Sequence, residues 1–289
     1  MDWQQRMARS IGWIEDHLTE GFSVESAARE ANCSAFHFMR MFDVITGITP
    51  AEYVRRRRLS RAAVDIASTG AKVIDVALRY GYDSPDSFAR AFRREFGVNP
   101  SDAREPGTTL HAYPPISFTI AIQGDKAMEY RIEKRPAYRL TGFSLRQTTA
   151  DGSNFINIPK FWDDAMADGR CDRLWQIASA SPLGVVGVCY DHDMKTGDFS
   201  YAIAIETPAD RSVLPEGMVD IEVPESTWAM FVSRGPMVPN YQNMIKRIYS
   251  EWFPSSGREH AGTAEIEFYN THPDPTAADY WCEYWVPLK

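Results

Sequence analysis

One short pattern occurs twice in the first third of this chain, and it limits what that part can fold into. The stretches SAFHFMRMFDVITGITP, residues 34–50, and SPDSFARAFRREFGVNP, residues 84–100, agree at six places. The shared pairs are Ser34/Ser84, Phe38/Phe88, Arg40/Arg90, Phe42/Phe92, Gly47/Gly97 and Pro50/Pro100. Phenylalanines four residues apart share one face of an α-helix, and glycine and proline end it. The repeat therefore predicts two copies of one short helix with the same buried face.

Further helices are predicted around the two copies. The segment SVESAAREAN begins with Ser23, a residue type that caps helix N-termini. Between the copies, PAEYVRRRRLSRAAVDIAST has Pro50 near its start and a rough apolar stripe, which favours one longer helix. Each copy then ends a helix pair, at about 23–46 and 73–96. The expectation for residues 1–106 is an all-α domain.

A helix–turn–helix unit would explain why the copies differ where they do. Its second helix lies in the major groove of DNA, so its buried face is constant while its outward face varies with the bases. Two units on one chain could contact groove segments roughly 34 Å apart. The positions that differ between the copies include Phe36/Asp86, His37/Ser87 and Met39/Ala89.

Ordinary structural roles are open for several of these residues. Phe36 could belong to the core. Arg40 could be a solvated arginine that pairs with Asp43, and Arg90 could form a surface ion pair with Asp86, worth roughly 0.3–0.5 kcal/mol. The four arginines at residues 55–58 circle their helix, so at most two can face DNA.

The charge of the chain is unevenly divided. The formal net charge is −8, from 31 basic and 39 acidic residues. Residues 1–105 hold 15 of each kind, so residues 106–289 hold the remaining 16 basic and 24 acidic residues. Because phosphate contact depends on a local basic face, the acidic total does not exclude DNA binding by the first part.

Residues 3–105 resemble the DNA-binding domain of the AraC/XylS family of bacterial transcription regulators. The resemblance rests on AREANCSAFHFMRMFDVITGITPAEYVRRRRLSRA and on VALRYGYDSPDSFARAFRREFGVNPSDAR. It implies a regulator that binds double-stranded promoter DNA and acts with RNA polymerase. It also implies that certain side chains of the two recognition helices face the bases: Phe36, Met39, Arg40, Asp86, Ser87 and Arg90, with Arg58 in the linker helix. His37 is a further DNA-binding candidate, because this position differs between the two copies.

The sequence pattern changes after residue 106. EPGTTLHAYPPISF is rich in proline, glycine and threonine, and residues 107–127 are expected to be a linker. Beyond it, aromatic and β-branched segments predict strands, interrupted by the helical stretches PKFWDDAMAD and NYQNMIKRIYSEWF. Strands, a helix and a strand pair follow one another twice, which predicts a diverged duplication in an α+β domain at 128–289.

No catalytic or metal-binding motif stands out in this second domain. DHDMKTGDFSYA has Asp191 and Asp193 at the spacing of a calcium loop, but Ala202 stands where a bidentate acid belongs, so a hairpin loop is expected. The cysteines have no metal-ligand or redox spacing, and we expect neither a metal nor a cofactor. They are Cys33, Cys171, Cys189 and Cys282.

Acids stand among aromatic residues near the C-terminus, in AEIEFYN and DYWCEYWVPLK. On a strand, Glu265, Glu267 and Tyr269 point to one face. A carboxylate beside aromatic rings can hold a lipophilic cation through charge attraction and cation–π contact. The alternative is that these acids are solvated on an outer face of the sheet.

Residues 128–289 resemble the GyrI-like effector-binding domain, through WAMFVSRGP, EWFPSSG, IEFYN and EYWVPL. The resemblance implies two β-α-β-β repeats around a ligand cleft, and an acid that meets cationic compounds and falls on Glu267. Further candidates are Tyr269, Tyr280, Trp228 and Trp162. The last three, Tyr280, Trp228 and Trp162, could also be ordinary core residues.

Together these features predict a one-component regulator, not an enzyme, that senses a small and lipophilic cationic effector, as multidrug sensors do. Two alternatives stay open: a GyrI-like hydrolase in which Glu267 activates water, or a partner-binding module. The apolar runs are short of a membrane span and the N-terminus lacks a signal-peptide core. We therefore expect a cytoplasmic protein, associated with the nucleoid through DNA.

Overall fold

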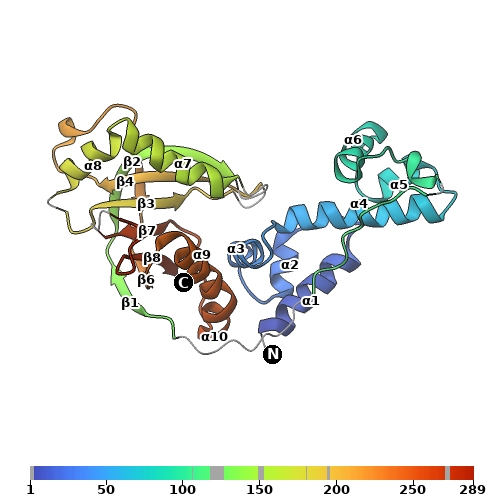
Figure 1. Cartoon of the computed structure of the whole chain (residues 1–289). Coiled ribbons are helices and arrows are strands. Elements are labelled where there is room, and N and C mark those ends of the chain that lie inside the picture. The colour runs from blue at the N-terminus through green and yellow to red at the C-terminus, as the bar shows by residue number, and fades with distance from the viewer. Residues whose placement is uncertain are drawn as a thin grey trace. The chain divides into compact units, whose positions relative to one another are not determined.

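Two compact units make up the computed structural model of this chain, shown in Figure 1, which describes residues 3–105, 107–117, 127–148, 153–179, 181–193, 196–270 and 274–289. Met1–Met39 and Thr49–Ala121 form the first unit, and Arg40–Ile48 with Ile122–Lys289 form the second. The second unit therefore includes a short segment from the first third of the chain. Part of the expected linker, residues 118–126, lies outside the described residues.

Residues 3–105 are helical, as expected. Helices α2 and α3 form one short pair, helices α5 and α6 form another, and the longer α4 separates them. The bounds are α1 Trp3–Asp16, α2 Val24–Glu30, α3 Ala35–Thr46, α4 Pro50–Ser68, α5 Val73–Arg79, α6 Pro85–Phe96 and the 3-10 helix η1 Asp102–Arg104. Ser23 caps α2 by accepting from the Ser26 N–H at 3.2 Å.

Apart from the arginine and the proline, the residues that the two copies share begin, bury or end each helix. The hydroxyls of Ser34 and Ser84 accept backbone N–H bonds three residues on, at 3.3 and 3.1 Å. Gly47 and Gly97 both have φ of 76°, a left-handed conformation that favours glycine at a helix end. The four shared phenylalanines are fully buried: Phe38, Phe42, Phe88 and Phe92. The repeat is therefore one helix design used twice.

A single antiparallel sheet of eight strands organises the second unit, in the order β1-β6-β8-β7-β3-β4-β2-β5. The strands are β1 Tyr130–Arg135, β2 Tyr138–Thr148, β3 Val185–Tyr190, β4 Asp198–Glu206, β5 Val219–Val223, β6 Ser226–Arg234, β7 Glu265–Tyr269 and β8 Trp281–Leu288. The other elements are α7 Asn154–Ala167, α8 Arg170–Ala178, η2 Arg211–Val213, α9 Met237–Arg247, the π-helical turn η3 Ile248–Trp252 and α10 Phe253–Ser256. Strand β5 and helix α8 were not predicted.

The sheet has the predicted duplication. Each half runs strand, helix, strand, strand, and each is preceded by one more strand, β1 or β5. If β1, β2, β3 and β4 exchange labels with β5, β6, β7 and β8, the strand order reads the same backwards. The two extra strands cross over: β1 pairs with β6 of the second half, and β5 pairs with β2 of the first.

The two faces of the sheet have different neighbours. Helices α7 and α8 pack on one face, against strands β2, β3 and β4 (Figure 1). Cys171 and Leu174 of α8 join Tyr201 and Ile203 of β4 in the core of this face. The opposite face has its own core of sheet side chains, among them Trp228, Ile266 and Trp285. Among the described residues, no helix has the length and apolar character required to cross a bilayer.

Candidate functional sites

The second predicted recognition helix, α6, presents arginines to solvent. Arg90, Arg93 and Arg94 are exposed, and so is Asp86 in the first turn. Ser87 is half-buried, and its hydroxyl is used in the cap at the start of the helix. Exposed guanidinium groups can bind phosphates and guanine edges, so this helix has the groups that a groove contact needs.

The first predicted recognition helix, α3, is more covered. Phe36 and Met39 are half-buried, and His37 is only 5% exposed. The guanidinium of Arg40 is held by the second unit, to which residues 40–48 belong. The base-contact roles of these four residues stay predictions.

The basic run of α4 is bound within the first unit. Arg58, a predicted DNA contact, donates to the carbonyl oxygens of Leu18 and Glu20 at 2.6 and 2.5 Å. Arg57 pairs with Glu15 at 2.7 Å. These arginines therefore tie α4 to the end of α1 and the loop after it, and the DNA role of Arg58 stays a prediction.

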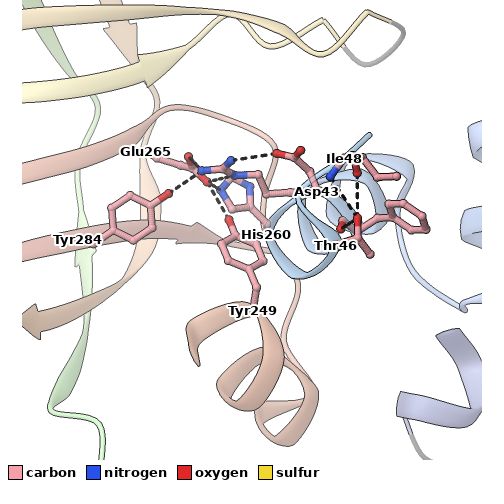
Figure 2. A network of polar contacts seen from close by, with 9 residues as sticks. Asp43, Thr46, Ile48, Tyr249, His260, Glu265 and Tyr284 are labelled. Carbon is pink, nitrogen blue, oxygen red and sulfur yellow. Dashed lines mark hydrogen bonds and ion pairs between the residues drawn. The ribbon is translucent and has the colours of Figure 1, made fainter. Parts of the chain in front are cut away.

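Glu265 is the centre of a buried polar network on β7. Its side chain is 0% exposed, and Arg40 binds both its oxygens, with Nε at 3.1 Å and Nη2 at 2.8 Å. The Tyr249 hydroxyl donates to Glu265 Oε1 at 2.8 Å, and His260 Nε2 lies 3.1 Å from the same oxygen. The Tyr284 hydroxyl accepts from Arg40 Nη2 at 3.1 Å. Figure 2 shows Tyr249, His260 and Tyr284 gathered around Glu265 and the guanidinium that binds it.

The protonation states of this network follow from its contacts. His260 Nδ1 accepts the N–H of Gly262 at 2.8 Å, so the ring proton lies on Nε2 and points to Glu265. Burial lowers the pKa of His260, which keeps the imidazole neutral. Burial alone would raise the pKa of Glu265, but the charge of Arg40 outweighs it and the pKa lies well below its ordinary value. Glu265 and Arg40 are therefore a charged and hydrogen-bonded pair.

Asp43 lies at the edge of the same network, on α3. Its carboxylate is 4.0 Å from Arg40 Nη1, at the limit of an ion pair. Burial raises the pKa of Asp43 to about 6, Arg40 opposes this shift, and the charge of Glu265 adds to it. Glu265 therefore takes most of the Arg40 charge, and Asp43 competes for it at a longer distance.

Glu267, the predicted effector-binding acid, has a different environment on the same face of β7. The hydroxyls of Tyr201 and Tyr269 both donate to its Oε2, each at 2.5 Å. Trp162 donates from Nε1 to the Tyr201 hydroxyl at 2.8 Å, and its ring meets Tyr269 edge-on at 5.3 Å. Among the residues that the structure describes, no basic side chain pairs with Glu267. The structure thus brings together three predicted residues, Glu267, Tyr269 and Trp162.

Two residues of this cluster were missed by sequence reasoning. Tyr201 comes from β4, and Gly187 of β3 lies directly opposite Glu267 in the sheet. A methyl group at Gly187 would collide with the Tyr201 hydroxyl and the Glu267 carboxylate. The absence of a side chain at 187 therefore leaves the room in which these two groups meet. Only the strand pairing could have revealed either residue.

The remaining predicted residues lie elsewhere in the domain. Trp228 is fully buried in the core of the opposite sheet face, with its ring 6.3 Å from that of Trp285. Tyr280 precedes β8 and is also buried, which raises the pKa of its hydroxyl to about 12. Another acid of the C-terminal region, Glu283 on β8, is bound by both Nη atoms of Arg131, at 2.7 and 2.9 Å.

Comparison with known proteins gives matches to both parts of the chain. A model of the GyrI-like small molecule binding domain matches residues 128–289, and a helix-turn-helix domain model matches residues 27–106. The chain is similar to the Right origin-binding protein of Escherichia coli (strain K12), at 39% identity over 299 aligned positions and 96% of both chains. Its first part is similar to Regulatory protein SoxS of Salmonella typhimurium, at 38% identity over 104 residues, 36% of this chain and 97% of the relative. A solved structure of SAV2435 bound to tetraphenylphosphonium is 20% identical, with a TM-score of 0.49, and the likeness covers 56% of this chain and 94% of the other.

Proposed function

This chain belongs to the AraC family of transcriptional regulators and carries a GyrI-like small molecule binding domain, and from that premise we propose that it senses a lipophilic cation and adjusts transcription in response. In this proposal residues 1–106 bind promoter DNA, residues 107–127 link the domains, and residues 128–289 bind the effector. RNA polymerase is the partner through which the bound regulator acts.

The environment of Glu267 carries the proposal for a cation. The carboxylate receives two phenol hydrogen bonds but has no basic partner within the described residues. Burial and the charge of Glu267 hold the pKa values of Tyr201 and Tyr269 well above the ordinary value, so both phenols keep their protons. A cation that reaches Glu267 meets a fixed negative charge and the rings of Trp162 and Tyr269.

The proposed role of Glu267 is electrostatic, not catalytic. Acid–base hydrolysis commonly needs a second group to supply or accept a proton. The neighbouring acid on the same face, Glu265, is bound by Arg40, Tyr249 and His260 and is not free for that role. A hydrolase is nevertheless testable, because its turnover of an electrophilic ester panel would disappear in Glu267→Gln.

Cation binding is tested by isothermal titration of the full chain with phenyltrimethylammonium and with its uncharged isostere tert-butylbenzene. We expect the cation to bind more tightly, and Glu267→Gln to lose about tenfold of that affinity, or ~1.4 kcal/mol. Glu222→Gln is the matched control, because this strand residue is 84% exposed. Equal binding of both probes, or an unchanged affinity in Glu267→Gln, would place the effector site elsewhere.

DNA binding is tested with a duplex selected from a random pool by the wild-type chain. Arg90→Ala is expected to weaken binding of the selected duplex by about 1–3 kcal/mol and to relax the preference at one base pair. Arg79→Ala is the control, since this exposed α5 arginine pairs with Asp65 at 3.1 Å. If Arg90→Ala binds the selected duplex as the wild type does, α6 is not a recognition helix.

A further inference from the structure

The arginine predicted to contact DNA in the first recognition helix is the arginine that binds Glu265. Arg40 lies within the helix-turn-helix match at 27–106, yet its contacts place it in the second compact unit. Its Nε and Nη2 groups are directed to Glu265 and Tyr284. A guanidinium that binds guanine O6 and N7 needs the same two-pronged donor edge. Arg40 cannot make both sets of bonds at once.

The groups around Glu265 fit a guanidinium closely. The carboxylate accepts the bidentate bond, the Tyr284 hydroxyl accepts a further N–H, and the guanidinium carbon lies 5.5 Å from the centre of the Tyr249 ring. Tyr249 lies in η3, the π-helical turn between α9 and α10. Such turns often occur at functional sites. The site therefore combines charge, geometry and an aromatic face for one planar cation.

The binding of Arg40 is strongly coupled to the burial of Glu265. A fully buried carboxylate is costly without a positive partner, even when Tyr249 donates to it and the neutral His260 lies 3.1 Å away. Because His260 is neutral, Arg40 is the cation that balances Glu265 within the described network. Release of Arg40 to DNA thus has a free-energy cost that the DNA contact must exceed.

We propose that Glu265 and DNA compete for Arg40, so that the Glu265 site holds the first recognition helix in an inhibited state. This inference rests on the proposed function, because it requires Arg40 to be a DNA contact. The wild-type chain then binds its operator more weakly than a chain in which the Glu265 site is removed. The difference is a coupling free energy between the two sites.

The Glu267 cluster is positioned to influence this competition. Tyr284, which accepts from Arg40, is the cross-strand neighbour of Glu267. The ring of Tyr241 packs edge-on against Tyr284 at 5.8 Å, and burial, with the charge of Glu267 adding to it, raises the pKa of Tyr241. A cation bound at Glu267 would therefore lie one strand away from Tyr284, which accepts a hydrogen bond from Arg40.

The test measures operator affinity of full-length variants by fluorescence anisotropy, with the duplex selected by the wild-type chain. Glu265→Gln removes the charge that holds Arg40, and we expect operator binding to become at least about fivefold tighter. Tyr284→Phe removes one hydrogen bond and keeps the ring, so a smaller change in the same direction is expected. Glu222→Gln, at an exposed position on β5, is the matched control and should bind as the wild type does.

The outcomes separate this inference from the proposed function. If Glu265→Gln is folded by circular dichroism and binds the operator no more tightly than the wild type, competition is rejected. If that variant does not fold, Tyr284→Phe decides: tighter binding supports competition, and unchanged binding rejects it. Arg40→Ala is measured beside them. If Arg40→Ala loses operator binding but Glu265→Gln does not bind more tightly, only the competition is rejected. If Arg40→Ala and Arg90→Ala both bind the operator as the wild type does, the proposed DNA contacts themselves are rejected.

Discussion

Glu265 and Glu267 lie two residues apart on β7 and point to the same face of the sheet, but they have opposite kinds of partners. Glu265 has the guanidinium of Arg40 at 2.8 Å, whereas Glu267 has the hydroxyls of Tyr201 and Tyr269 at 2.5 Å. The first carboxylate is neutralised from within the chain, and the second is solvated by neutral donors. One strand thus holds a satisfied ion pair beside an acid that can still attract a cation.

Gly187→Ala should weaken cation binding without the removal of any polar group. The added methyl would displace the Glu267 carboxylate and the Tyr201 hydroxyl, which meet opposite this glycine. We expect a loss of about tenfold in affinity for phenyltrimethylammonium, or ~1.4 kcal/mol, by titration calorimetry. Gly12→Ala is the control, because a methyl there has nothing within 4 Å. Unchanged affinity in Gly187→Ala would show that these two groups do not form the binding site.

Tyr201→Phe should separate the hydrogen bond from the packing. The variant keeps the ring but loses the hydroxyl that accepts from Trp162 and donates to Glu267. Without this donor the Glu267 carboxylate is held in position by one hydrogen bond fewer. Cation affinity should therefore fall by a few-fold, in line with about 1 kcal/mol for one hydrogen bond. Titration calorimetry measures this, and an increase in affinity would contradict the arrangement.

Arg57→Met should destabilise the first unit strongly. Arg57 is 6% exposed and Glu15 16% exposed, so the substitution leaves a nearly buried carboxylate without its cation. The expected loss is about 3–5 kcal/mol in the free energy of unfolding, measured by urea denaturation. Arg79→Met breaks an exposed pair with Asp65 and should cost at most about 1 kcal/mol. Equal losses in the two variants would contradict the difference in burial.

Asp43→Asn should change how stability depends on pH. The folded-state pKa of Asp43, about 6, lies above its unfolded value, so the folded chain binds more protons between these pKa values and loses stability as pH rises through the window from about 4 to 6. Asparagine does not titrate, so the variant should gain stability over the wild type across this window, by on the order of 2 kcal/mol at pH 7. Denaturation at pH 4, 5, 6 and 7 checks this. A difference that does not grow with pH would contradict the raised pKa.

The helices and most strands could be predicted because their signals are local. The serine caps, the buried phenylalanines and the αL glycines all act within one helix. Helix α8 and strand β5 were missed for local reasons too. The sequence of α8, RCDRLWQIA, is rich in charge, and β5 is five residues long with mostly exposed side chains. Short and exposed elements are stabilised by tertiary contacts that no local pattern reports.

The candidate sites could be predicted only where one strand contains them. Because side chains alternate between the two faces of a strand, Glu267 and Tyr269 were predicted to lie on one face, as observed. Tyr201 joins them through the order β7-β3-β4, and Arg40 reaches Glu265 across 225 residues of chain. Such contacts depend on strand order and packing, which the pattern of a single segment does not contain.

The reciprocal pairing of β1 with β6 and of β5 with β2 also bears on how this domain can change over evolution. The first strand of each half pairs with a strand of the other half. If one half were deleted, β1 or β5 of the remaining half would lose its pairing partner, and so would β2 or β6. The two halves therefore depend on each other. The two copies can diverge in side chains, but they must be kept and must fold together.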